Sequence, residues 1–132
     1  RKGRIPMAKA KVVSVRYSGN GPTWHIALTK RRLANLFRAA ARNLDARPGM
    51  WGKGRLHACC GNSEKFCALG MINHVACVEN EYNGITTAAQ RAFRFANEQN
   101  IITTNDSAYS VDQVTKLMRR AAAYLDHGGS FE

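Results

Sequence analysis

The sequence predicts an α+β fold that is mainly α-helical, with an N-terminal β-hairpin packed on a bundle of about four helices. Two observations support this prediction. Residues 11–28 alternate apolar and polar side chains on either side of a turn cluster, as the two strands of a hairpin do. After residue 29, apolar side chains recur every three or four residues, in stretches that begin with helix-capping residues.

The hairpin is predicted from two short alternating segments around the turn residues 18–22. Its apolar side chains are Val13, Val15 and Tyr17 on the first strand, and Trp24, Ile26 and Leu28 on the second. Two strands are not stable alone in water, so the hairpin must pack on the helices. We therefore expect Tyr17 and Trp24 to point inward. If exposed, these rings, interleaved with basic residues, would be able to stack on bases.

The first helix is predicted to begin after Thr29, a good N-cap, and to run to about Leu44. Its apolar stripe consists of Leu33, Leu36, Phe37, Ala40 and Leu44. At 100° per residue, the side chains opposite that stripe are Arg31, Asn35, Arg38 and Arg42. No acidic residue lies on this basic ridge, so we expect its arginines to be free for an anionic partner.

The rest of the chain is predicted as an irregular segment followed by three further helices. Residues 46–62 are rich in glycine, and Trp51 within them is the ring that we expect to be exposed. The later helices are predicted to begin near Ser63, at Thr87 and at Ser110. Ile101 and Ile102 are interpreted as a short link that could be extended.

The length favours a single domain over residues 11–126, with a basic tail at 1–10 and a C-terminal tail at 127–132. Met7 is a candidate natural initiator, which would make residues 1–6 an addition to the natural chain. No apolar run approaches the roughly 18 residues of a membrane span, and the start of the chain lacks the apolar region of a secretory signal.

The four cysteines do not resemble a disulfide framework. Cys59 and Cys60 are adjacent, while Cys67 and Cys77 are ten residues apart on one predicted helix. Reduced thiols are typical of cytoplasmic proteins, so we expect a cytoplasmic location.

The net charge of +11 is concentrated in the first part of the chain. Residues 1–56 contain 14 lysines and arginines and one acid, for a net charge of +13. Residues 57–132 contain six lysines and arginines and eight acids, for a net charge of −2. Such a basic region attracts polyanions, of which nucleic acid is the commonest in a cell. An acidic protein partner, or solubility alone, would account for the same charge.

Three short motifs resemble those of a known family. They are Trp51 with Gly54, Cys67-Ala68-Leu69-Gly70, and Asn105-Asp106 followed by Ser110 and Val114. Together they are similar to motifs of an actinobacterial and actinophage family to which no function is assigned. The likeness covers about residues 30–125. It implies a helical fold and a phage or actinobacterial origin, and it implies no reaction.

Cys67 is the residue with most promise for catalysis. A thiol in the first turn of a helix can have a lowered pKa, and His57, His74 or Asp106 could serve as its base or orienting partner. Against this, Phe66 and Leu69 beside it suggest a core position. A buried cysteine usually acts as a small apolar residue.

A zinc site is the second chemical alternative. The available ligands are His57, Cys59, Cys60, Cys67 and His74. Their spacing is not a recognised zinc pattern, and the chain has no phosphate-binding glycine loop or paired-carboxylate motif. We expect no metal and no cofactor.

The favoured hypothesis is a small basic, non-enzymatic accessory protein, phage-encoded and acting in the host cytoplasm, that binds nucleic acid through phosphate contacts. The candidate binding residues are Lys9, Lys11, Arg16, Arg31, Arg38, Arg42, Trp51, Lys53 and Arg55. DNA and RNA are both open as targets, as is the oligomeric state. The first alternative is a host-modulating or virion protein that binds an acidic protein surface. The second is a cysteine-dependent enzyme that uses Cys67.

Overall fold

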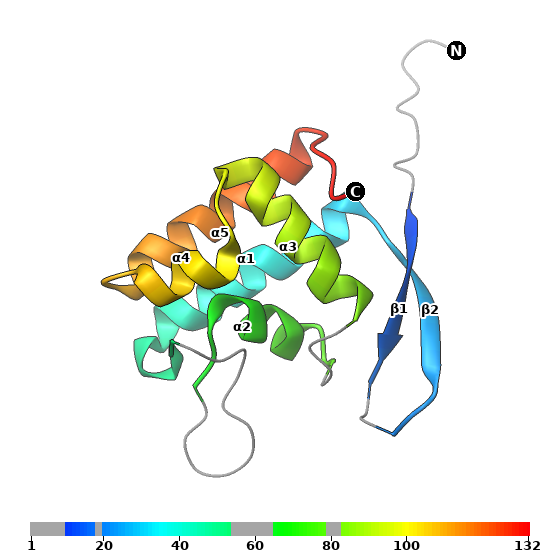
Figure 1. Ribbon diagram of the computed structural model, residues 1–132, viewed down its shortest axis with the longest axis horizontal. Helices are drawn as coiled ribbons and strands as arrows, with labels where there is room; N and C mark the ends of the chain where they lie inside the picture. Colours follow the sequence, from blue (N-terminus) through cyan, green and yellow to red (C-terminus); the bar gives the residue numbers. More distant parts are fainter. Residues whose placement is uncertain (1–9, 18–19, 54–64, 79–82) are drawn as a thin grey trace.

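A computed structural model describes residues 10–17, 20–53, 65–78 and 83–132, and it confirms the predicted fold class (Figure 1). The elements are β1 (Lys11–Arg16), β2 (Thr23–Leu28), α1 (Lys30–Ala46), the 3₁₀ turn η1 (Pro48–Met50), α2 (Ala68–Val75), α3 (Gly84–Asn97), α4 (Ile101–Ser107) and α5 (Val111–Asp126). The described part of the chain thus has five α-helices where about four are predicted. None of these helices combines the length and the apolarity that a membrane crossing requires.

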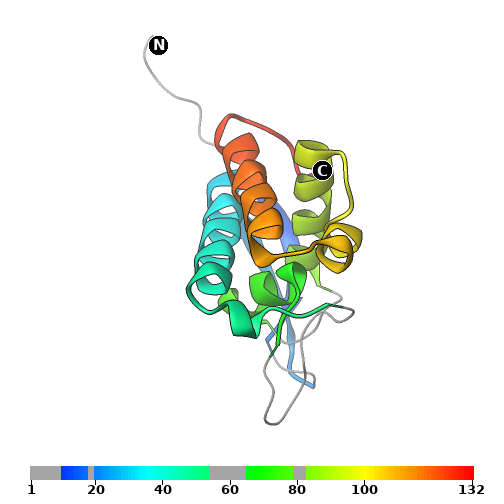
Figure 2. The same cartoon turned by 90° about the vertical axis from the view of Figure 1, so that its left-hand side faces the viewer.

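The centre of the molecule is formed by α1, α5 and α3. Figure 2 shows α5 lying between the other two. The predicted apolar stripe of α1 is confirmed, since Leu33 and Phe37 are fully buried. They join Met118 of α5 and Phe93 of α3 in one continuous core. Burial of these side chains, rather than local helix preference, provides most of the stability of such helices.

The hairpin packs on this core through one of its two strands. β1 lies beside α3, and β2 is the outer strand (Figure 1). The strands are antiparallel, and Val13 and Val15 are buried as predicted. The predicted burial of Tyr17 and Trp24 is wrong, because the turn end of the hairpin extends beyond the helices and leaves both rings exposed.

Gly84, the first residue of α3, explains how closely that helix approaches the hairpin. A Cβ atom at this position would overlap the side chain of Val13 and would lie 3.0 and 3.1 Å from the backbone N and O of Ser14. Only glycine therefore allows the start of α3 to touch the backbone of β1 without displacement.

Two predicted helix starts are wrong. α3 begins one turn before Thr87, because the side chain of Asn83 accepts hydrogen bonds from the N–H groups of Ile85 and Thr86 and caps the helix earlier. α2 begins after Ser63, with Cys67 as its N-cap. Phe66 is held in extended backbone instead, where its N–H donates to the Met50 carbonyl.

The interpretation of Ile101 and Ile102 as an extended link is also wrong, since both belong to α4. The side chain of Asn100 accepts from the N–H groups of Ile102 and Thr103 and starts this short helix. The start of α5 is close to prediction. Its N-cap Ser110 makes no side-chain cap bond, and Gln113 instead accepts from the N–H of Tyr109 at 2.7 Å.

The residues after α5 pack on the domain, in contrast to the tail expected at 127–132. Phe131 is only 3% exposed and joins the core. The Gly129 N–H donates to the Tyr124 carbonyl, and the Tyr124 hydroxyl donates to the Ser130 carbonyl, both at 2.8 Å. These contacts return the chain towards the hairpin, where Lys11 and Glu132 form an ion pair at 3.5 Å.

Candidate nucleic-acid interface

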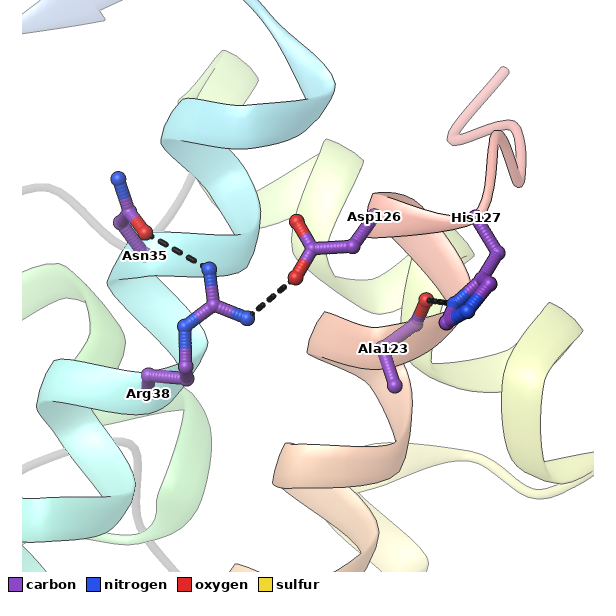
Figure 3. Close-up of polar contacts among 5 residues, drawn as sticks. All are labelled: Asn35, Arg38, Ala123, Asp126 and His127. Carbon is purple, nitrogen blue, oxygen red and sulfur yellow. Dashed lines mark hydrogen bonds and ion pairs between the residues drawn. The ribbon is translucent and has the colours of Figure 1, made fainter.

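The basic ridge predicted on α1 is only partly free. Arg38 lies between α1 and α5, where its guanidinium is 2.6 Å from the Asp126 carboxylate (Figure 3). The same side chain donates to Asn35 Oδ1 at 2.8 Å. The expectation that the arginines of the ridge have no acidic partner is therefore wrong for Arg38, because it pairs with an acid from α5, 88 residues later.

A second ion pair joins the same two helices further along. Arg119 of α5 contacts the Asp45 carboxylate of α1 at 2.6 Å, and the Thr115 hydroxyl donates to Asp45 Oδ1 at 2.8 Å. We call this line of contacts between α1 and α5, from Arg38–Asp126 to Asp45–Arg119, the seam. Both carboxylates of the seam are already paired with an arginine, so they do not neutralise other cations.

Four other cations of the same two helices make no ion pair with any described residue. They are Arg31 and Arg42 on α1, and Lys116 and Arg120 on α5, all with exposed side chains. We call these four residues the basic face. Arg31 and Arg42 are 11 residues apart, which places them roughly 16 Å apart along one side of the helix. The basic face thus offers widely spaced cations, which suit phosphates that are not neighbours along a strand.

Lys116 and Arg120 are absent from the predicted site because the second half of the chain is acidic overall. The sequence of α5 nevertheless indicates that both side chains are exposed. Both residues lie on the side of α5 opposite the buried Val114 and Met118. What the sequence does not reveal is that α5 lies beside α1 and adds its cations to those of the ridge.

The other predicted binding residues belong to separate parts of the molecule. Lys11 is paired with Glu132, and Arg16 donates to the Thr23 hydroxyl across the hairpin at 2.8 Å. Trp51 and Lys53 follow η1 at the C-terminal end of α1, whereas the hairpin leads into its N-terminal end. Lys9 and Arg55 lie outside the described residues. The described cations are therefore distributed over several surfaces.

Trp51 does not form the exposed ring that the sequence suggests. Its indole N–H donates to Asn105 Oδ1 at 2.7 Å, and the ring packs against the core. The ammonium of Lys53 lies 5.6 Å from the ring centroid, within reach of a cation–π contact. Trp51 is thus held by the fold and is poorly placed to stack on a base.

Asn105 is fully buried and connects three distant segments. Its Oδ1 accepts from the Trp51 indole and from the Ala68 N–H at 3.0 Å, while its Nδ2 donates to the Gly52 carbonyl at 2.9 Å. We call these four residues the Asn105 junction. Segments from all three motifs on which the family resemblance rests therefore meet here, in a structural role.

The expectation of a lowered thiol pKa at Cys67 is wrong. Cys67 is 3% exposed, and burial raises the pKa of its thiol above the ordinary value of 9.0. The Asp106 carboxylate also raises this pKa, whereas hydrogen bonds from the Gly70 and Leu69 N–H groups act in the opposite direction. The thiol caps α2, with Sγ accepting from the Gly70 N–H at 3.4 Å.

The other candidate ligands and bases do not gather around Cys67 in the described structure. His74 is exposed and stacks at 4.8 Å on the ring of Phe66. His57, Cys59 and Cys60 lie outside the described residues. Among residues 10–17, 20–53, 65–78 and 83–132, no group of three or more metal-binding side chains occurs.

The two described cysteines are expected to differ strongly in alkylation rate. Cys67 is buried and its raised pKa keeps it protonated at pH values where an ordinary thiol begins to ionise, whereas Cys77 is exposed. Because the thiolate is the reactive form, Cys67 should react with iodoacetamide at least about tenfold more slowly at pH 8. Peptide mapping by mass spectrometry resolves the two sites. Equal rates would instead indicate an accessible, activated Cys67.

Comparison with known proteins gives no further assignment. No protein-family model matches the chain, and it has no significant match among curated proteins or solved structures. The family resemblance noted from the three motifs therefore stays a prediction.

Proposed function

We propose that this protein is a small, non-enzymatic accessory protein that binds nucleic acid through the basic face. The observation that carries the proposal is the surplus of cations along the seam. Asp45 and Asp126 are each paired with an arginine, while Arg31 and Arg42 have no ion pair with a described residue. Phosphates are the ligands that such a row of exposed cations fits best. The family resemblance adds the expectation of a phage-encoded protein in the host cytoplasm.

The chemistry of Cys67 favours binding over catalysis. A nucleophilic cysteine needs a stabilised thiolate and access to substrate. Cys67 has a raised pKa and is almost fully buried. Its bond to the Gly70 N–H is explained by capping of α2. A structural role therefore accounts for this residue without a reaction.

The direct test is a double charge reversal, Arg31→Glu with Arg42→Glu. The affinity for a short labelled nucleic acid should fall at least about tenfold near physiological salt, because phosphate contacts are lost and repulsion replaces them. The plot of log affinity against log salt concentration should lose about two units of slope. The melting temperature should stay close to that of the parent, since both side chains are exposed.

A matched control uses Arg91→Glu with Arg94→Glu. Both residues are exposed on α3, so the change in net charge is the same while the basic face is intact. An equal loss of affinity in this control would mean that overall charge, and not the basic face, governs binding. Arg38→Glu is a poor choice for either variant, because it would place a carboxylate against Asp126 and alter stability as well.

A further inference from the structure

Two large aromatic rings lie together on one face of the hairpin. Trp24 is 54% exposed and Tyr17 is 40% exposed. Trp24 is directly opposite Val15 in the strand register, so the two side chains emerge on the same face. Tyr17 follows Val15 by two residues and continues that face. The rings therefore form one patch, which we call the aromatic patch (Tyr17 and Trp24).

The aromatic patch is exposed because the helices cover only part of this face of the hairpin. Val13 lies over the start of α3, and both Val13 and Val15 are buried. The turn end of the hairpin projects past the helices in both views (Figures 1 and 2). Large rings in such a position keep apolar area in contact with water, which in soluble proteins often marks a surface for a partner.

The charge around the aromatic patch favours an anionic partner. Residues 1–28 contain no aspartate or glutamate. Arg16 and its partner Thr23 alternate with Val15 and Trp24, so their bond holds the guanidinium on the opposite face at the same end of the hairpin. Flat aromatic faces at a hairpin end that has a cation and no carboxylate from the same segment suit a ligand that has both planar rings and negative charge.

We propose that the aromatic patch binds single-stranded nucleic acid by stacking Trp24 and Tyr17 on unpaired bases. This inference rests on the proposed function and narrows its substrate class. A duplex keeps its bases stacked on each other, so it cannot offer them to the rings, whereas a single strand can. Stacking needs no particular base, so we expect the protein to prefer single-stranded over double-stranded nucleic acid and to show little preference for sequence.

The test compares two single strands with the same phosphates, one with bases and one with abasic sites throughout its middle. The parent protein should bind the base-containing strand about tenfold or more tightly. Trp24→Ala should remove most of this preference, and Trp24→Phe should restore much of it because a ring is retained. Tyr109→Ala is the matched control, since Tyr109 is a 93% exposed ring far from the hairpin in sequence. RNA and DNA versions of the strand identify the preferred nucleic acid.

Each outcome decides between the two proposals. Equal binding of both strands by the parent protein overturns the stacking inference and leaves phosphate binding by the basic face intact. No binding of either strand near physiological salt overturns both proposals. If Trp24→Ala leaves the preference for bases unchanged, or instead converts a dimer to a monomer in solution, the aromatic patch has another use and the inference fails. Loss of the preference in Trp24→Ala, with Tyr109→Ala unchanged, supports it.

Discussion

Asn105→Ala is expected to lower the free energy of unfolding by about 3–5 kcal/mol, because it leaves several buried polar groups without partners. The Ala68 N–H and the Trp51 indole both donate to Asn105 Oδ1, and the Gly52 carbonyl accepts from Nδ2. Each unsatisfied buried group costs about 1–3 kcal/mol. For a small domain this is a large fraction of a total stability of roughly 5–15 kcal/mol. Urea unfolding followed by circular dichroism measures the change.

Asn100→Ala is an informative control for this prediction. Asn100 Oδ1 also accepts two backbone hydrogen bonds, from Ile102 and Thr103, but the residue is exposed. Water can replace its side chain, so the expected loss is about 1 kcal/mol, as for other N-caps. Similar losses in the two variants would show that burial of Asn105 is not what makes the Asn105 junction important.

Coupling within the Asn105 junction can be measured by adding Trp51→Phe. This change removes the indole N–H and keeps an aromatic ring of similar placement. The Trp51 indole N–H lies 2.7 Å from Asn105 Oδ1, so each single variant already loses this hydrogen bond. The double variant should therefore lose less free energy of unfolding than the two single variants lose in sum. If the losses in free energy of unfolding were strictly additive, the two residues would stabilise the fold independently.

Gly84→Ala is expected to lower the free energy of unfolding by about 1–3 kcal/mol, because the added methyl group has no space. The nearest atoms belong to the rigid side chain of Val13 and the backbone of Ser14, so β1 and α3 must move apart. Gly49→Ala is the control, since no atom lies within 4 Å of a Cβ atom there. It should leave stability nearly unchanged, and the same urea experiment compares them. If Gly84→Ala had the same free energy of unfolding as the parent protein, the hairpin would not be held against α3.

The parts of the fold with strong local patterns were predictable from the sequence. The alternation of Val13 and Val15 specifies a strand, and the spacing of Leu33, Phe37 and Leu44 specifies a helix with one buried side. Thr29 was recognisable as a cap and accepts from the Arg32 N–H at 3.0 Å. In these segments the local signal and the tertiary packing agree.

Other features depended on weaker or competing local signals. The run Ile101–Thr104 is β-branched and resembles extended chain, yet the Asn100 cap and burial of Ile101 make it helical. Thr87 has the pattern of a capping box, but Asn83 caps α3 one turn earlier. A strong cap further upstream overrides a plausible one within the helix.

The site was least predictable where it depends on contacts between distant residues. Arg38 was expected to be free because no acid lies near it on α1, and its partner Asp126 is 88 residues away. Asn105 reaches Trp51 across 54 residues and the Ala68 N–H across 37. Such pairings leave no local pattern. The exposure of Trp24 was unpredictable for the same reason. Strand alternation predicts on which face of the hairpin a side chain lies, but it does not predict how much of that face the helices cover.

The seam also has a consequence for how the chain acquires its structure during synthesis. α1 is synthesised before its partner α5, and all the other described helices lie between them in the chain. Until α5 is made, the apolar side of α1, with Leu33 and Phe37, lacks a large part of the surface that buries it, since α2 and α3 cover only the rest. Closing so long an intervening loop makes folding slower than in bundles of sequential helices. A stalled nascent chain that ends before Val111 should therefore stay protease-sensitive and bind chaperones, and release of α5 should abolish both properties.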